Sequence, residues 1–121
     1  MHRSIITVAV GLALISGSVV NPDWLGSSGA DTAAFSWAFH LVGYAVLAAA
    51  IRRSFGPGWR GAAAAVAVAT GVGAGVELVQ LGIAYRTGSV ADAVLNAVGS
   101  VVGVTAARVA RYRPWVSPTR R

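Results

Sequence analysis

The chain alternates between long apolar stretches and short polar connectors. A helix that crosses a bilayer core of about 30 Å needs roughly 17 to 25 mostly apolar residues, because it rises about 1.5 Å per residue. Four stretches meet this requirement, approximately residues 4–20, 33–51, 61–84 and 90–107. The connectors carry Gly, Pro, Asn and Ser, which are typical of turns. We therefore predict an all-α fold, a bundle of four transmembrane helices that forms a single domain over residues 1–121.

The first apolar stretch has a second interpretation, as a cleaved signal peptide. Arg3 would be its basic start, and Ser16, Gly17 and Ser18 would provide the small residues of a cleavage site. The sequence leaves both interpretations open. Cleavage would keep the orientation of the other three predicted spans unchanged.

The positions of the arginines predict the topology. Nine of the ten lie on one side of the predicted spans, in the N-terminal segment, the connector after the second span and the C-terminal tail. The other side carries only Arg86, together with Asp23 and Asp31. Because basic residues are retained on the cytoplasmic side, we expect both termini and the basic tail, residues 108–121, in the cytoplasm. We also expect a multi-pass protein of the cell membrane.

The composition excludes several classes of function. The chain is 55% hydrophobic and 12% charged, whereas soluble domains contain about a quarter charged residues. The lack of cysteine excludes disulfides, thiolate metal sites and cysteine nucleophiles. The net charge of +6 follows mainly from the topology, and no aromatic residues interleave with the basic ones in a nucleic-acid-binding pattern. We therefore expect membrane lipid, and no nucleic acid, as a partner.

Polar residues recur at helical spacing on the second, third and fourth predicted spans. They are His40, Tyr44, Glu77, Gln80, Asp92 and Asn96. Spacings of three and four residues place those of each span on one helix face. All except Tyr44 fall within roughly 4 to 12 Å of the predicted outer boundary. Because an ionisable side chain in lipid costs about 2.5 to 3.5 kcal/mol, we expect these faces to point at one another and to form an outward-facing polar pocket.

Glycines lie on the same faces as the polar residues. Gly73 lies one turn before Glu77, and Gly99 and Gly103 follow Asn96 at spacings of three and four. Small residues let membrane helices approach closely, where packing holds the helices together. We expect all three glycines to serve helix packing.

Each polar residue also has a structural interpretation. Ser89 and Asp92 form an S-x-x-D pattern, in which the serine hydroxyl caps the start of the fourth helix. Gln80 and Asn96 are typical of hydrogen bonds between membrane helices. Tyr44 would pack in the core with its hydroxyl satisfied, and His40 would be a neutral, hydrogen-bonded core histidine. An ion pair of Glu77 and Arg86, shared with Asp92, would act as a structural clamp.

The charge of this group of residues also has a functional interpretation. Two carboxylates, Glu77 and Asp92, face the single cation of Arg86 in the predicted pocket. Their charges balance only if His40 is protonated or one acid is neutral, which would couple the site to pH.

The ordered combination of these motifs resembles the VanZ-like family, which is named for a protein associated with resistance to the glycopeptide antibiotic teicoplanin. The resemblance runs from about Trp37 to Gly103. Its motifs are His40-x-x-x-Tyr44-x-x-Leu47, Glu77-x-x-Gln80, and Arg86-x-x-Ser89-x-x-Asp92-x-x-x-Asn96-x-x-Gly99-x-x-x-Gly103. It implies a small multi-helix membrane protein with a role in the cell envelope. Where many members have an Asp-Lys pair before the histidine motif, this chain has Phe35-Ser36-Trp37-Ala38 and no lysine.

The leading functional hypothesis is a pocket that binds a polar or anionic component of the cell envelope. Its candidate residues are His40, Tyr44, Glu77, Gln80, Arg86, Ser89, Asp92 and Asn96. Arg86 would hold the anionic group, and His40 or Glu77 would respond to protonation. We expect no cofactor and no metal, because His2 lies at the opposite end of the topology and leaves His40 without a second histidine.

Two other classes of function remain open. In an enzyme, His40 or Glu77 would act as general base on a lipid-linked or phosphate-bearing substrate, although no nucleophile elbow or phosphate loop is present. In a scaffold, the polar network would only fix the helix register, and the glycine faces would dock a partner membrane protein or a second copy of the chain.

Overall fold

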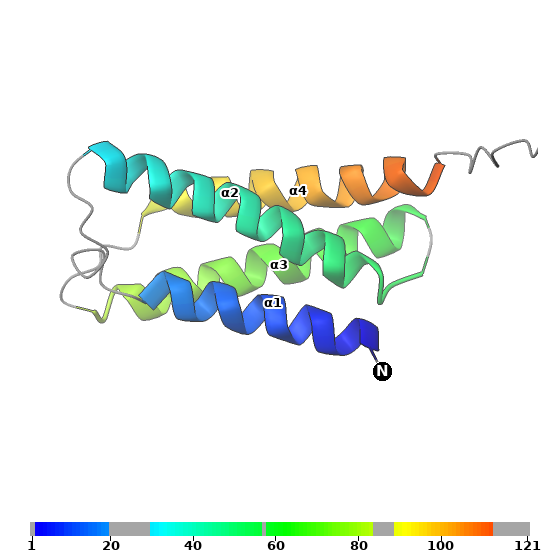
Figure 1. Ribbon diagram of the computed structural model, residues 1–121, viewed down its shortest axis with the longest axis horizontal. Coiled ribbons are helices and arrows are strands. Elements are labelled where there is room, and N and C mark those ends of the chain that lie inside the picture. Colours follow the sequence, from blue (N-terminus) through cyan, green and yellow to red (C-terminus); the bar gives the residue numbers. More distant parts are fainter. Residues whose placement is uncertain (1, 20–29, 57, 84–88, 113–121) are drawn as a thin grey trace, which may run out of the picture.

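Four antiparallel helices form the structure, a computed structural model that describes residues 2–19, 30–56, 58–83 and 89–112. The helices are α1 (His2–Val19), α2 (Ala30–Arg52), α3 (Trp59–Gln80) and α4 (Val90–Tyr112). They run alternately up and down, so that the end of α1, the start of α2, the end of α3 and the start of α4 lie together (Figure 1). The described residues contain no strand. The prediction of an all-α four-helix bundle is confirmed.

Three of the four helices are long and apolar enough to cross a membrane. Their candidate spans are Thr32–Arg52, Trp59–Gln80 and Val90–Arg111. The apolar part of α1, Ile5–Ser18, is shorter. The third predicted span extended to residue 84, but α3 ends at Gln80 because the chain then tightens into a turn. There the Gly82 N–H donates to the carbonyl of Val79 at 3.0 Å.

Fully buried polar side chains and exposed large apolar side chains distinguish the bundle from a soluble protein. Asn96 and Ser100 are fully buried, whereas large apolar side chains such as Val42, Leu78 and Val101 are more than half exposed on the outer faces. Such an arrangement is stable where hydrocarbon surrounds the bundle. It supports a location in the membrane.

The closest helix contact joins α2 and α4. A Cβ atom added at Gly99 would collide with the main-chain carbonyl of Leu41, and one added at Gly103 would collide with that of Ala45. Only glycine therefore permits this approach of the two backbones. Beside it lies a small core that includes Tyr44.

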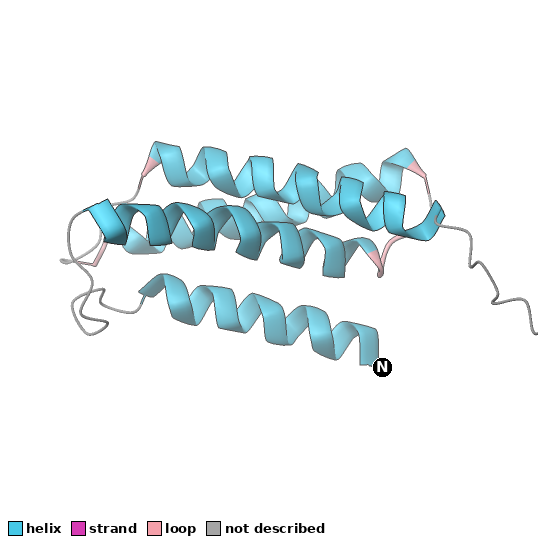
Figure 2. Ribbon diagram, turned by 45° about the horizontal axis from the view of Figure 1, so that its top comes forward, coloured by secondary structure: helices cyan, strands magenta, loops and turns pink. Residues whose placement is uncertain are grey.

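The first helix packs along α2 and makes fewer contacts with α3 (Figure 2). Leu14 of α1 fills the space above Gly43 of α2, where a Cβ atom would meet the leucine side chain. In the last turn of α1, the main-chain carbonyl of Ser18 accepts a hydrogen bond of 2.7 Å from Gln80 Nε2 of α3. This hydrogen bond ties the end of α1 to the end of α3.

Arg52 organises the turn between α2 and α3. Its side chain is only 6% exposed and donates to the carbonyls of Phe55, Gly56 and Gly58, with the shortest bond, 2.7 Å, to Gly56. Gly58 adopts a φ of 100°, which favours glycine. The sequence pattern predicted Arg52 only as a topology signal, so its role in the turn is an addition to that prediction.

Candidate functional site

The polar residues of three helices meet at one end of the bundle. His40 lies in the first half of α2, Glu77 in the last turn of α3, and Asp92 and Asn96 in the first two turns of α4. These positions share a level because the end of α3 and the starts of α2 and α4 lie together (Figure 1).

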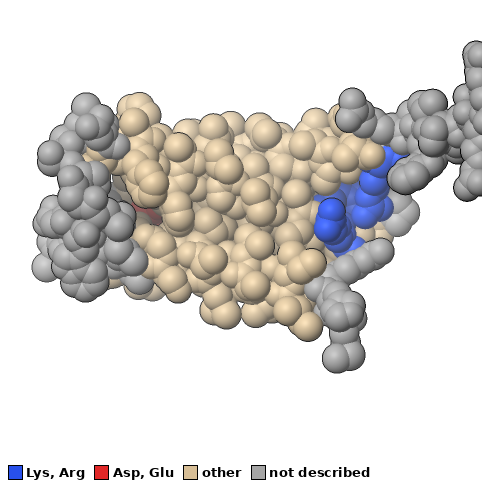
Figure 3. All heavy atoms as spheres, in the orientation of Figure 1, with Lys and Arg blue, Asp and Glu red and all other residues tan. Residues whose placement is uncertain are grey.

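The described arginine side chains gather at the opposite end of the bundle, while the acidic surface lies near the end with the cluster (Figure 3). The arginines at this opposite end are Arg52, Arg53, Arg60, Arg108 and Arg111. Positive and negative charges are therefore separated from each other along the long axis of the molecule.

His40 is the central residue of the cluster. Its side chain is 3% exposed, and Nδ1 lies 2.7 Å from Oδ1 of the fully buried Asn96. Because an amide oxygen only accepts hydrogen bonds, this contact places the ring proton on Nδ1. The other ring nitrogen, Nε2, lies 3.7 Å from Oδ2 of Asp92. The imidazole thus bridges two residues of α4.

Tyr44 stacks on the histidine from one turn further along α2. The two rings are 6.2 Å apart at their centroids and nearly parallel, at 4°. Tyr44 is fully buried, and its hydroxyl has no hydrogen-bond partner among the described residues. It therefore places a free polar group beside His40.

Glu77 joins α3 to the start of α4. Its Oε2 accepts a hydrogen bond of 2.9 Å from the main-chain N–H of Ser89. The Ser89 hydroxyl in turn accepts a bond of 3.3 Å from the N–H of Asp92, as in a helix N-cap. The second carboxylate oxygen of Glu77, Oε1, is buried and has no hydrogen-bond partner within the described part of the chain.

His40, Glu77 and Asp92 form a compact triad. One candidate ligand atom from each residue lies within 4.8 Å of the others, and the first two side chains are buried. The sequence excluded thiolate and multi-histidine metal sites, but this combination of one imidazole with two carboxylates was not predicted. The triad draws its members from three helices, so no local spacing in the sequence indicates it.

Three other residues predicted from the sequence lie outside the triad. Gln80 is buried, but its amide donates to α1 and contributes a helix contact. A Cβ atom added at Gly73 would lie 2.7 Å from Asn96 Nδ2, so this glycine makes room for the Asn96 side chain. Arg86 lies outside the described residues, and its predicted pairing with Glu77 and Asp92 stays a prediction.

Two hydrogen-bonding groups of this region were not predicted from the sequence. Ser100 is fully buried and donates to the main-chain carbonyl of Asn96 at 2.7 Å. Its position one turn after Asn96, on the same face, was a signal that could have found it. The carbonyl of Ser18, which accepts from Gln80, gives no signal in the sequence because every residue carries this group.

Comparison with known proteins gives the family of the chain. No curated protein and no solved structure matches it significantly. The sequence profile of the VanZ/LLP1 family matches residues 9–111, a range that contains most of α1, nearly all of the other three helices and every residue of the triad. The resemblance inferred from the motifs is thereby confirmed. The chain is a membrane protein that belongs to the VanZ/LLP1 family.

Proposed function

We propose that this protein binds a polar or anionic component of the cell envelope at the cluster around His40. The proposal places the protein in the cell membrane as a multi-pass protein, with the arginine-rich end in the cytoplasm and the cluster near the outer surface. The separation of charge along the bundle supports this orientation.

The main support for this proposal is a set of buried polar atoms without hydrogen-bond partners among the described residues. Glu77 Oε1, Asn96 Nδ2 and the Tyr44 hydroxyl are buried and lack hydrogen-bond partners among the described residues. All three residues border His40 or belong to its triad. A buried polar atom without a partner costs about 1–3 kcal/mol. A headgroup with both donors and acceptors would satisfy this set.

The charge of the cluster restricts what can bind. Its described members include two carboxylates and one imidazole, a set that favours ligand hydroxyl or amino groups as hydrogen-bond donors. An anionic group additionally requires a cation. In the sequence, Arg86 precedes the capping residue Ser89 by three positions and is the candidate for that role.

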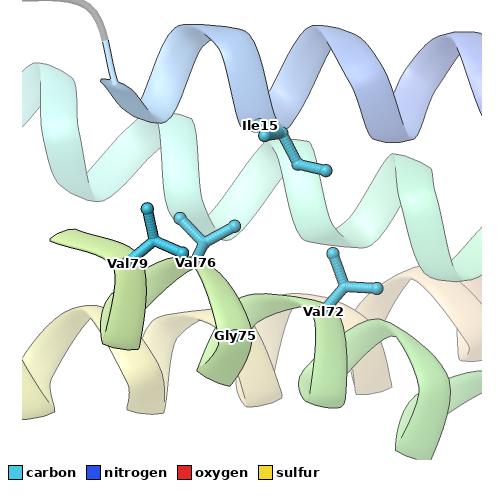
Figure 4. A pocket seen from close by; sticks show the side chains of 5 residues that line it. All are labelled: Ile15, Val72, Gly75, Val76 and Val79. Atoms are coloured by element: carbon cyan, nitrogen blue, oxygen red, sulfur yellow. The ribbon is translucent and has the colours of Figure 1, made fainter.

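An apolar hollow between α1 and α3 supports a ligand with a hydrocarbon chain. It measures about 320 Å³ and is lined by Ile15, Val72, Gly75, Val76 and Val79. Ile15 comes from α1 and faces the three valines of α3 (Figure 4). Val79 lines the hollow and shares the last turn of α3 with Glu77, so a chain in this hollow would have its headgroup at the depth of the cluster. We therefore favour a lipid-linked component.

A purely structural network is the second candidate. Hydrogen bonds link α2 to α4 through His40 and Asn96, and α3 to the cap of α4 through Glu77 and Ser89. These bonds favour a role in fixing helix register. A structural role predicts that Glu77→Gln lowers stability and leaves ligand binding unchanged.

Ligand binding by the purified chain tests the proposal. Native mass spectrometry in detergent would measure binding of three probes: phosphatidylcholine, phosphatidylglycerol and a polyprenyl phosphate. We expect the two anionic probes to bind better than phosphatidylcholine. Arg86→Ala should weaken the binding of both about tenfold, because the phosphate loses its cation, and Glu77→Ala should weaken that of phosphatidylglycerol about tenfold, because a glycerol hydroxyl loses its acceptor. Asp31→Asn is the matched control, since its position on α2 lies nine residues, about 13 Å, from His40. Unchanged binding in well-folded Glu77 and Arg86 variants would remove the proposal.

A further inference from the structure

The triad has nearly the spacing of a metal site. Two ligand atoms that each lie about 2.1 Å from one tetrahedral zinc ion are about 3.4 Å apart. His40 Nε2 and Asp92 Oδ2 are 3.7 Å apart, and one candidate atom from each of the three residues lies within 4.8 Å of the others. Small side-chain rotations would bring the three atoms to one ion.

The surrounding hydrogen bonds leave the inner atoms free to act as ligands. With the amide orientation of Asn96 in the structure, His40 Nδ1 carries the proton and the lone pair of Nε2 faces a carboxylate oxygen of Asp92. Two acceptors that face each other are stabilised by a cation between them. A histidine that ligates a metal usually donates its other ring N–H in this way.

Glu77 provides an independent indication. Its side chain is 8% exposed, and Oε2 is held by the N–H of Ser89 while Oε1 has no hydrogen-bond partner among the described residues. A buried carboxylate with one anchored and one free oxygen is suited to monodentate metal binding. The free atom is thus available to a further ligand.

We propose that His40, Glu77 and Asp92 bind one divalent transition-metal ion, with zinc as the best fit. A neutral imidazole and two carboxylates neutralise an ion of charge +2, which lowers the cost of placing both acids in an apolar bundle. The imidazole selects against Mg²⁺ and Ca²⁺, which prefer oxygen ligands. This inference revises the expectation of no metal.

Three protein ligands leave a fourth position on a tetrahedral ion. This step rests on the proposed function: a phosphate oxygen of the anionic ligand would occupy that position. The ion would then supply positive charge at a cluster whose described carboxylates, Glu77 and Asp92, are both acidic.

Metal binding by the full chain tests the inference. The chain, purified without a polyhistidine tag and stripped with a chelator, would be titrated with Zn²⁺ and analysed by native mass spectrometry. We expect one Zn²⁺ per chain, no competition from Mg²⁺, and at least a tenfold loss of affinity in His40→Ala, Glu77→Gln and Asp92→Asn. His2→Ala and Asp31→Asn are the matched controls and should bind like the unaltered chain. Equal zinc binding in the triad variants and the controls, or no zinc bound at all, would overturn the site.

Replacing the His40 ligand by cysteine distinguishes loss of a metal ligand from misfolding of the variant. His40→Cys introduces the only cysteine of the chain. With Co²⁺ as the probe, this variant should gain a near-ultraviolet sulfur-to-cobalt charge-transfer band that the unaltered chain and His2→Cys both lack. Absence of the band from a folded His40→Cys chain would contradict ligation at this position.

The two proposals fail in different ways. One Zn²⁺ per chain without retention of either anionic probe would uphold the metal site and contradict the proposed function. Equal retention of polyprenyl phosphate by the zinc-loaded and the metal-free protein would contradict the part of the ion in ligand binding.

Discussion

His40 on α2 is hydrogen bonded to Asn96 on α4, with 2.7 Å between Nδ1 and Oδ1, although the residues are 56 positions apart in the sequence. Both side chains are buried, and Gly73 on α3 leaves the space that the amide of Asn96 occupies. The pair thus joins α2 and α4 directly and depends on the space that α3 leaves. It also fixes the orientation of the ring at the centre of the polar cluster.

Loss of this contact should destabilise the bundle. In Asn96→Ala, the ring N–H of His40 loses its partner inside the protein, and we expect the free energy of unfolding in detergent to fall by about 1–2 kcal/mol. Ser100→Ala is the control, because its hydroxyl only adds a bond to the helix carbonyl of Asn96 four residues earlier, a type of bond that does not stabilise helices, and its effect should stay below about 0.5 kcal/mol. Similar losses in both variants would show that the His40 contact has no special weight.

The glycines of α4 should tolerate no methyl group. A Cβ atom at Gly103 collides with the main-chain carbonyl of Ala45, so Gly103→Ala must push α2 and α4 apart at a cost of about 1–3 kcal/mol. Gly71→Ala on α3 meets nothing within 4 Å and should be neutral or slightly stabilising, since alanine favours helices over glycine by about 1 kcal/mol. Thermal unfolding of both variants in detergent is the measurement. A neutral Gly103→Ala would contradict the close approach of the two helices.

The helices and the level of the polar residues were predictable from the sequence for simple physical reasons. A bilayer requires long apolar runs, and the rise per residue of a helix converts position into depth. His40, Glu77 and Asp92 therefore had to lie at a similar depth if the topology was right. The motif order around them also indicated the family, which the profile match confirms.

The partners within the cluster could not be predicted. Helical periodicity gives the face on which Asn96 lies, but the choice of His40 over Tyr44 as its partner depends on helix rotation and on the space at Gly73. The end of α3 at Gln80 was also missed, because the residues that follow it remain apolar while their backbone forms a turn. Each of these features depends on tertiary contacts or on local backbone geometry.

Arg52 should matter more than its neighbour Arg53. Arg52 is buried and holds three main-chain carbonyls of the turn between α2 and α3, whereas Arg53 is exposed. We expect Arg52→Ala to lower the free energy of unfolding by about 1–3 kcal/mol, because the turn loses three hydrogen bonds from a charged donor. Arg53→Ala should change it by less than about 0.5 kcal/mol. If both substitutions have the same effect in chemical unfolding, the turn does not depend on this side chain.

Filling the hollow between α1 and α3 should block a lipid-linked ligand. Gly75 lines this hollow, and a Cβ atom added there would meet nothing within 4 Å, so Gly75→Phe can be accommodated without a backbone clash. We expect about tenfold weaker binding of polyprenyl phosphate with little change in melting temperature, because the aromatic ring takes the space of the hydrocarbon chain. Gly71→Phe is the matched control, since Gly71 also has open space but does not line the hollow. Unaltered binding by Gly75→Phe would exclude the hollow as the chain site.

The buried cluster around His40 is, on this account, completed by something other than protein. An experimental structure of the chain, extracted with its native membrane components and determined at a resolution that shows side-chain contacts, tests this most directly. We predict non-protein density within hydrogen-bonding or coordination distance of Glu77 Oε1 and bordering His40 and Asp92. The account would be contradicted if Glu77 Oε1, Asn96 Nδ2 and the Tyr44 hydroxyl were all paired with protein groups alone and the space between the three helices held no further density.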